Sequence, residues 1–411
     1  MTRQTTDELP AASRGASAAR TRAAVIGAAA NLFAERGYRA VSLRDIAAAG
    51  GISHPGLLRH FASKDDLLRA VVEQLDEVNR HVASDGATSL DAFVQVARQN
   101  DASPGYSRLL LGLVGIALSP CHPEHQAVAA RYEMAREGFA EAFRQFAAEM
   151  HSAVDADAEG IRMAAAWDGA QLIALYLPEV DVPSTLGRRL ATLGAATPRE
   201  LMTPLPPAAS APPAMSGADS DGYASGRARR AEIVAAAAER FAADGYHLTS
   251  LREVAAAAGT GPSTLVHHFG GKQQLLIAVL DQQEAELAGM QDDGGSEPGR
   301  LWSLPQRVQH HLENASQCVR LQATLRTEAV AADHPAHEHF ARRYRARIGD
   351  YATAIARAQE MGSVRGERDP WFEALWLVAL SDGLHLQWLY APAAVDPATL
   401  LTGYLDELRT A

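Results

Sequence analysis

The sequence predicts an all-α protein made of two similar halves. Apolar residues recur at helical spacing along most of the 411 residues, and aromatic residues make up only 6% of them. The stretch at residues 42–68, SLRDIAAAGGISHPGLLRHFASKDDLL, returns without a gap at residues 250–276 as SLREVAAAAGTGPSTLVHHFGGKQQLL. Self-similarity over such a distance indicates a duplicated structural unit.

The repeated stretch has the pattern of two short helices joined by a turn. Ser42 followed by Asp45 is typical of a capping box, here opening a helix over residues 43–49. Gly50-Gly51 supplies the turn, and Ser53 is placed to cap the next helix. This is the layout of a helix-turn-helix, which places its second helix in the major groove of DNA. The sequence therefore predicts two DNA readers in one chain.

Helical patterns continue beyond each reader. In the first half they are expected at residues 90–100, 104–118, 124–151, 158–177 and 184–193. Several dipeptides of the first half return in the second, namely His122-Pro123 as His334-Pro335, Arg131-Tyr132 as Arg343-Tyr344 and Asp168-Gly169 as Asp382-Gly383. The offset between the halves drifts only from 208 to 214 positions. A whole two-domain unit is therefore expected to have been duplicated.

The predicted domains follow from these patterns. Residues 197–226, rich in Pro, Ala, Ser and Gly, are expected to form a linker of extended character. The full division is a flexible arm (1–17), a first helix-turn-helix DNA-binding domain of three helices (18–65), a first helical regulatory domain (66–196), the linker, a second DNA-binding domain (227–273) and a second regulatory domain (274–411).

The net charge of −11 argues by itself against DNA binding, because phosphates need Lys and Arg partners. Local charge is more informative. Basic residues crowd both readers, namely Arg14, Arg20, Arg22, Arg36, Arg39, Arg44, Arg59 and Lys64 near the first and Arg227, Arg229, Arg230, Arg240, Arg252 and Lys272 near the second.

Other functional classes lack support in the sequence. Cys121 and Cys318 are far apart, which indicates no disulfide framework and a reducing compartment. No apolar run approaches the roughly 20 residues of a membrane span, and residues 1–17 lack the apolar core of a signal peptide. We therefore expect a cytoplasmic protein. No catalytic or phosphate-binding motif is present, so neither an enzyme nor a cofactor is expected.

The two readers resemble those of the TetR family of bacterial transcriptional regulators. The matching residues are Ala29 to Tyr38 (A-x-x-L-F-A-x-x-G-Y), Ser42 to Ala47 (S-L-R-D-I-A) and Ser53 to Leu68 (S-x-x-x-L-x-x-H-F-x-S-K-x-D-L-L). The resemblance implies a three-helix DNA-binding domain and a larger helical domain that binds a small ligand and dimerises through a four-helix bundle. Ordinary members are homodimers of chains about half this length.

Carried over position by position, the resemblance implies two sets of DNA-facing residues. In the first unit they are Ser42, Arg44, Ser53, His54, Pro55, Gly56, Arg59, His60 and Lys64. In the second they are Ser250, Arg252, Gly261, Pro262, Ser263, Thr264, His267, His268 and Lys272. Helix N-termini offer N–H groups to phosphates, and Lys64 and Lys272 add a charge there. His60 and His268 are equally compatible with packing beside the following Phe, and Arg36 and Arg39 are interpreted as solvated.

Some positions depart from the family pattern. Members usually carry a phosphate-contacting Tyr where this chain has Leu58 and Val266, so backbone anchoring is weaker or these residues pack. Gly261 replaces the capping Ser, which typically costs a few tenths of a kcal/mol. The second reader is therefore expected to be less stable or less specific.

Ligand and metal sites are less clearly marked. The residues that could line an effector pocket are Tyr106, Met134, Met163, Trp167, Tyr176, Trp376, His385 and Trp388, although residues at this helical spacing more often belong to the core. His334, His337 and His339 lack partners at metal-ligand spacing apart from adjacent carboxylates, and His-Pro is better interpreted as a helix start. No metal site is predicted. Asp168-Gly169 and Asp382-Gly383 are expected to pack at the dimerisation bundle.

The sequence therefore predicts a transcriptional regulator, specifically a ligand-responsive repressor. Its partners would be a double-stranded DNA operator and an unknown small-molecule effector, with the halves paired as an intrachain pseudo-dimer or the chain as a homodimer. Because the two recognition helices differ in sequence, the operator is expected to be asymmetric. The alternative is a ligand-binding or protein-interaction module in which one or both readers are degenerate.

Overall fold

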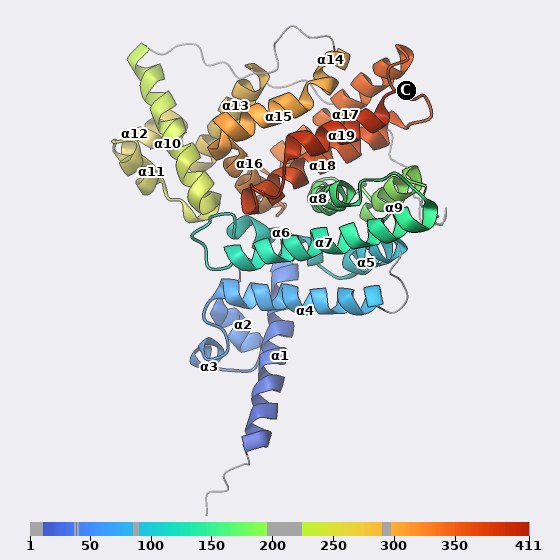
Figure 1. Ribbon diagram of the computed structural model, residues 1–411. Helices are drawn as coiled ribbons and strands as arrows, with labels where there is room; N and C mark the ends of the chain where they lie inside the picture. Colours follow the sequence, from blue (N-terminus) through green and yellow to red (C-terminus); the bar gives the residue numbers. More distant parts are fainter. Residues whose placement is uncertain are drawn as a thin grey trace, which may run out of the picture.

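The computed structural model describes residues 11–36, 38, 41–84, 90–194, 224–289 and 297–410. Within these ranges the chain is helical, and the only extended pairing is one isolated antiparallel bridge between Val364 and Arg409. The predicted all-α fold is confirmed (Figure 1). None of the described helices is both long enough and apolar enough to cross a membrane.

The helices of the first unit follow the predicted order closely. They are α1 (Ala11–Arg36), α2 (Leu43–Ala49), α3 (His54–Leu58), α4 (Lys64–Ser84), α5 (Asp91–Ala102), α6 (Tyr106–Ile116), α7 (His125–Met150), α8 (Ala156–Ala174) and α9 (Val182–Thr192). The His-Pro segment does precede a helix, because α7 begins at His125.

The second unit repeats this order. Its helices are α10 (Ala224–Leu248), α11 (Leu251–Ala257), α12 (Pro262–Phe269), α13 (Lys272–Gly289), α14 (Glu297–Trp302), α15 (Leu304–Asn314), α16 (Ser316–Glu328), α17 (His337–Glu360), α18 (Pro370–Tyr390) and α19 (Pro397–Leu408). Gly245 interrupts α10 with a φ of 77° and a ψ of 172°, so its last turn leaves the axis of the helix.

Two segments predicted to be irregular contain helical residues. Helix α1 begins at Ala11, inside the predicted arm, and α10 begins at Ala224, inside the predicted linker. Both starts are rich in Ala and Arg, which are strong helix formers. The rest of the arm (1–10) and of the linker (197–223) lies outside the described residues, as do Gly37 and Arg39.

Each unit joins its reader to its regulatory domain through one long helix. Helix α4 starts beside the reader and packs against α1, α5 and α6. In the second unit helix α13 packs against α10 and α12 of the reader, and its Glu284 accepts a hydrogen bond from Arg343 of the regulatory domain. In Figure 1 the two readers, α2 with α3 and α11 with α12, lie on the same side of the molecule at opposite ends.

The two units pack on each other through α8 and α18, with α7 against α8 and α17 against α18. The crossing is close because a Cβ atom on Gly169 would lie 2.8 Å from Cα of Ala379, and one on Gly383 would lie 2.9 Å from Cα of Ala165. The two contacts are equivalent under exchange of the units. The Asp-Gly pairs therefore sit at the interface, as predicted from the sequence.

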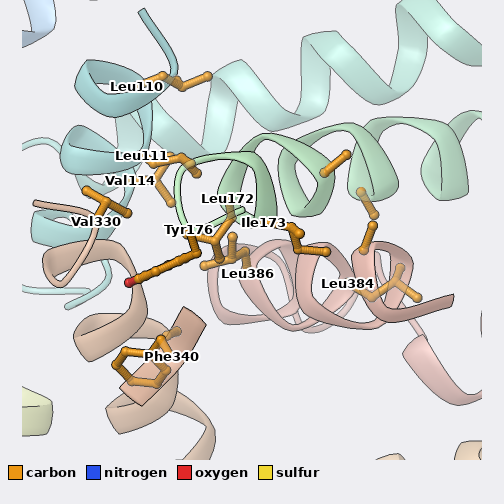
Figure 2. Close-up of a cluster of buried hydrophobic side chains, with 14 of the residues drawn as sticks. Leu110, Leu111, Val114, Leu172, Ile173, Tyr176, Val330, Phe340, Leu384 and Leu386 are labelled. Atoms are coloured by element: carbon orange, nitrogen blue, oxygen red, sulfur yellow. The ribbon is translucent and has the colours of Figure 1, made fainter. Parts of the chain in front are cut away.

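Further paired contacts show that the units are related by a pseudo-two-fold axis. Tyr176 donates a hydrogen bond to the carbonyl of Arg326, and Tyr390 donates one to the carbonyl of Val114. The ring of His125 lies 4.9 Å from that of Tyr390, and its counterpart His337 lies 5.1 Å from Tyr176. Figure 2 shows that the apolar core around Tyr176 is shared by α6, α8, α17 and α18.

Candidate nucleic-acid interface

The first reader is shaped by its two caps. The Ser42 hydroxyl accepts a hydrogen bond from the Asp45 N–H at 3.2 Å, and the Asp45 carboxylate accepts from the Ser42 N–H at 2.9 Å. This reciprocal pair is the predicted capping box. Ser53 accepts from the Gly56 N–H at 3.1 Å and so caps α3. Gly51, with a φ of 68°, makes the turn between the helices.

Aromatic residues anchor both recognition helices in the same way. Phe61 is buried beside α3, and the guanidinium of Arg22 lies 4.9 Å from its ring centre. In the second unit Arg230 lies 4.9 Å from the ring of Phe269. Two of the basic residues that crowd the readers in the sequence therefore pack over an aromatic ring.

The structure brings the predicted DNA-facing residues of the first unit together around α2, α3 and the start of α4. The side chains of Ser42, Arg44, Ser53, Pro55 and Arg59 are exposed, whereas His54, Gly56, His60 and Lys64 are partly buried. A surface of this composition offers guanidinium, hydroxyl and imidazole groups to solvent.

The second reader has the same shape with a weaker cap. Its capping box is intact, because Ser250 and Glu253 bond reciprocally at 3.2 and 2.7 Å. Helix α12 has Gly261 at its N-cap and no side-chain cap, as the sequence indicated. Ser250, Arg252, Pro262, Ser263 and His267 are exposed, whereas Gly261, Thr264, His268 and Lys272 are partly buried.

Equivalent lysines at the third helix of each reader lie over an aromatic ring. The ammonium of Lys64 is 4.2 Å from the ring centre of Tyr38, and that of Lys272 is 4.3 Å from Tyr246. Lys272 also donates a hydrogen bond to the carbonyl of His247 at 3.2 Å. These contacts, which the sequence did not reveal, hold both charges at a helix N-terminus.

Leu58 and Val266 occupy equivalent positions on the two recognition helices. Their side chains are 44% and 48% exposed. They are therefore not core residues, so the interpretation that they simply pack is wrong, whereas weaker anchoring to the DNA backbone stays a prediction. Each reader therefore presents a branched apolar side chain on the exposed surface of its recognition helix.

The residues predicted to line an effector pocket are distributed over both regulatory domains. Tyr106, Met163, Tyr176 and Trp376 are buried, and Trp167, His385 and Trp388 are partly buried. Met134 is 64% exposed, so its assignment to an interior pocket is wrong. It lies two residues from the buried Tyr132, which puts it on the opposite side of α7 because successive residues are about 100° apart.

Two hollows of the structure are lined by other residues. A small cavity of about 10 Å³ in the second unit is enclosed by Arg326, Phe340, Arg343, Tyr344 and Arg347. A wider cleft of about 470 Å³ lies between the units, and its walls include Arg162, Arg365, Arg368 and Glu407. Neither is lined by the eight predicted pocket residues, so the effector pocket stays a prediction.

A buried ion-pair network ties the units together at this cleft. Arg189 donates to Glu159 at 2.7 Å, and both side chains are only 1% exposed. Arg189 also donates to Glu407 of the second unit at 2.8 Å, and Arg162 reaches the same carboxylate at 2.6 Å. Burial with full pairing is what makes such charges tolerable inside a fold. No sequence motif marked these residues.

Comparison with known families now decides the identity of the readers. The model described as "Bacterial regulatory proteins, tetR family" matches residues 25–71 and again residues 233–279. The model described as "BetI-type transcriptional repressor, C-terminal" matches residues 316–410.

The chain belongs to the TetR family. It carries two TetR units in tandem.

Curated relatives match a short stretch of this chain. The HTH-type transcriptional repressor Rv3405c of Mycobacterium tuberculosis is 51% identical over 53 residues, which is 13% of this chain and 28% of that protein. The HTH-type transcriptional repressor KstR2 of Rhodococcus jostii is 41% identical over 80 residues, which is 18% of this chain and 39% of that protein. The chain thus spans well under half the length of either relative.

Solved structures similar to one TetR unit include Salmonella enterica GusR and the ketosteroid transcriptional regulator KstR2 of Mycobacterium tuberculosis. GusR is 26% identical, with a TM-score of 0.37, over 44% of this chain and 95% of that one. KstR2 is 23% identical, with a TM-score of 0.34, over 43% of this chain and 91% of that one.

The two TetR units differ in the surroundings of one buried aspartate. Burial raises the pKa of Asp168 to about 6, against the opposing charge of Arg131. At the equivalent Asp382, burial also acts to raise the pKa, but Arg326 and Arg347 outweigh it and hold the pKa well below the usual range. Those arginines bond Asp382 at 2.8 and 2.7 Å. In the first unit the positions equivalent to Arg326 and Arg347 hold Val114 and Ala135.

In each TetR unit an arginine of the regulatory domain pairs with a carboxylate on the helix that follows the reader. Arg131 of α7 donates to Asp76 of α4 at 2.9 Å, and Tyr106 of α6 donates to the same carboxylate at 2.8 Å. In the second unit Arg343 of α17 donates to Glu284 of α13 at 2.7 Å. The repeated Arg-Tyr dipeptide was the signal in the sequence, but its partners were not recognised there.

Proposed function

We propose that the chain is a DNA-binding transcriptional regulator, specifically a ligand-responsive repressor, whose two TetR units act together as a dimer within one polypeptide. The observation that carries the proposal is the pseudo-two-fold packing of α8 on α18, which joins two complete readers without a second chain. The names of the relatives, HTH-type transcriptional repressors, support the coarser part of this proposal.

In this proposal each recognition helix enters the major groove, and the two grooves are one helical turn apart, about 34–36 Å. Arg44, Arg59 and Arg252 are exposed and suited to phosphates or guanine edges. His267 stands where Arg59 stands in the first unit. Since guanidinium and imidazole differ in their donor patterns, the two half-sites should differ in sequence, and the operator should be asymmetric.

Effector control would act through the helices that carry the readers. The ion pairs Arg131–Asp76 and Arg343–Glu284 join α4 and α13 to the long helices of the regulatory domains. An effector that favours one position of α7 or α17 would then favour one separation of the readers. Repression and release would be a shift between two populations, with the size of the shift set by the differential affinity of the effector.

Selection from random duplex DNA tests the operator. We expect an asymmetric site, an Arg59→Ala variant that loses base preference in one half, and a His267→Ala variant that loses it in the other half. The protein part of the complex with DNA should have the mass of one chain, 43.8 kDa. A palindromic site bound by two chains would contradict the pairing within one chain.

The alternative is a module with degenerate readers, favoured by the net charge of −11 and by the exposed Leu58 and Val266. A salt titration separates the two. DNA binding by readers that contact phosphates weakens steeply as salt rises, since bound counterions are released. Absence of salt-dependent binding by the intact chain to its own upstream DNA would support the alternative.

A further inference from the structure

Three side chains of the second unit place metal-ligating atoms together at the junction between its reader and its regulatory domain. One ligand atom each of His247, Glu328 and His334 lies within 4.8 Å of the other two. We propose that this cluster, here named the junction site, binds one divalent transition-metal ion of the zinc type and fixes the second reader to its regulatory domain.

The junction site draws on three separate segments. His247 lies in the last turn of α10, three residues before Ser250, the N-cap of the reader helix α11. Glu328 is the last residue of α16, and His334 lies in the loop that leads to α17. A metal ion held by all three would connect the start of the reader to two parts of the regulatory domain.

The side chains are already oriented around Glu328. Its side chain is only 2% exposed, and its carboxylate accepts from the N–H groups of Tyr246 and His247 at 2.7 and 2.8 Å. Nδ1 of His247 lies 2.6 Å from the same carboxylate. The ring centres of His247 and His334 are 5.1 Å apart. An ion bound by both groups would replace the hydrogen bond between His247 and Glu328, because ligand atoms about 2.0 Å from a tetrahedral ion lie about 3.3 Å apart.

The donor set selects the kind of ion. Two imidazoles and one carboxylate suit zinc, cobalt or nickel, whereas magnesium and calcium prefer ligands that are all oxygen. Three protein ligands leave a position for water. Nδ1 of His334 accepts a hydrogen bond from the Ala336 N–H at 3.1 Å, which leaves Nε2 as the nitrogen that would bind the metal. Coordination by Nε2 moves the ring proton to Nδ1, so the hydrogen bond from Ala336 would be lost. We therefore expect micromolar affinity, weaker than that of a closed four-ligand site.

The first unit offers a built-in comparison, because it keeps only one of the three ligands. The positions equivalent to His247 and Glu328 hold Arg39 and Ile116. Its remaining histidine, His122, lies 3.4 Å from the carboxylate of Asp65. The proposed metal would act on the second reader alone, which is the reader whose recognition helix lacks a side-chain cap.

Metal binding is tested without DNA. Tag-free intact chain is titrated with zinc against a chromophoric chelator of known affinity. We expect one equivalent per chain, lost in His247→Asn and retained in His122→Asn, the matched control. The His247 side chain is 45% exposed, so its replacement should leave the fold intact, which far-ultraviolet circular dichroism checks. Cobalt in place of zinc should give visible absorption that the same variant abolishes.

Equal zinc binding by His247→Asn and the unchanged chain would overturn the junction site, and so would the absence of a one-equivalent phase. Glu328→Gln serves as a second variant, expected to weaken binding at least tenfold. The effect of the metal on DNA binding rests on the proposed function. We expect zinc to increase the affinity of the second reader for its half-site. Zinc binding by a chain that never binds DNA would refute the proposed function and leave the junction site standing.

Discussion

Replacing Gly383 with alanine tests the packing that joins the two TetR units. The added Cβ atom would lie 2.9 Å from Cα of Ala165 and closer still to the carbonyl of that residue. Ordinary contacts of a Cβ atom begin at 3.4 Å, so the contact with Cα alone requires α8 and α18 to separate by about half an ångström, and the closer carbonyl requires a larger separation. Because the obstacle is backbone, no side-chain rotation can relieve it.

The expected cost combines strain with lost contacts. Overpacking of this kind costs about 1–3 kcal/mol. Separation of the helices also strains the hydrogen bonds from Tyr176 and Tyr390 across the interface, each worth about 1 kcal/mol. We therefore expect Gly383→Ala to lower the free energy of unfolding by about 2–4 kcal/mol. Gly169→Ala should behave in the same way, since it meets Ala379 equivalently.

Urea unfolding followed by circular dichroism measures the effect. Gly138→Ala in α7 is the matched control, because nothing lies within 4 Å of a Cβ atom at that position. Alanine there should stabilise the helix by about 0.5–1 kcal/mol. If Gly383→Ala and Gly138→Ala shift the unfolding midpoint in the same direction, the close crossing of α8 and α18 is refuted.

Four further outcomes are expected. Because the pKa of Asp168 is raised to about 6, its ionisation destabilises the fold as pH rises from about 4 to 6. Asp168→Asn should therefore raise the free energy of unfolding by up to about 3 kcal/mol at pH 7 and by little at pH 4. Asp382, whose pKa is lowered, contributes stability above about pH 4 that is lost as pH falls, so Asp382→Asn should destabilise at pH 7, as urea unfolding would show. Gly261→Ser should add the missing cap and increase hydrogen-exchange protection of α12 by a few tenths of a kcal/mol, whereas unchanged protection would contradict the role assigned to the cap. Lys64→Gln should lower the slope of log affinity for DNA against log salt by about 0.9 if its ammonium contacts a phosphate, and an unchanged slope would exclude that contact.

Local features were predictable from the sequence because they depend on neighbouring residues. The capping box of Ser42 and Asp45 needs only a spacing of three residues, and the structure forms it. Apolar spacing likewise predicted α5 to α9 to within a few residues. The repeat also predicted that Gly169 and Gly383 lie at equivalent positions of an interface.

Features that depend on distant residues were not predictable. Glu328 meets His247 across 81 positions, and no local pattern connects them. The pocket assignment of Met134 failed because an apolar residue type does not say which side of α7 faces inward. The different pKa values of Asp168 and Asp382 depend on Arg326 and Arg347, whose approach is a property of the packed bundle.

The packing of α8 on α18 joins two segments of the same polypeptide, which changes how pairing responds to the amount of protein. Between separate chains, pairing follows mass action and fails on dilution. Between tethered segments the effective concentration is fixed by the connecting chain, in the millimolar range for a short flexible connection. One copy of this chain therefore suffices for a paired state. A substitution in one reader leaves the other reader unchanged, whereas in a homodimer the same substitution would occur in both.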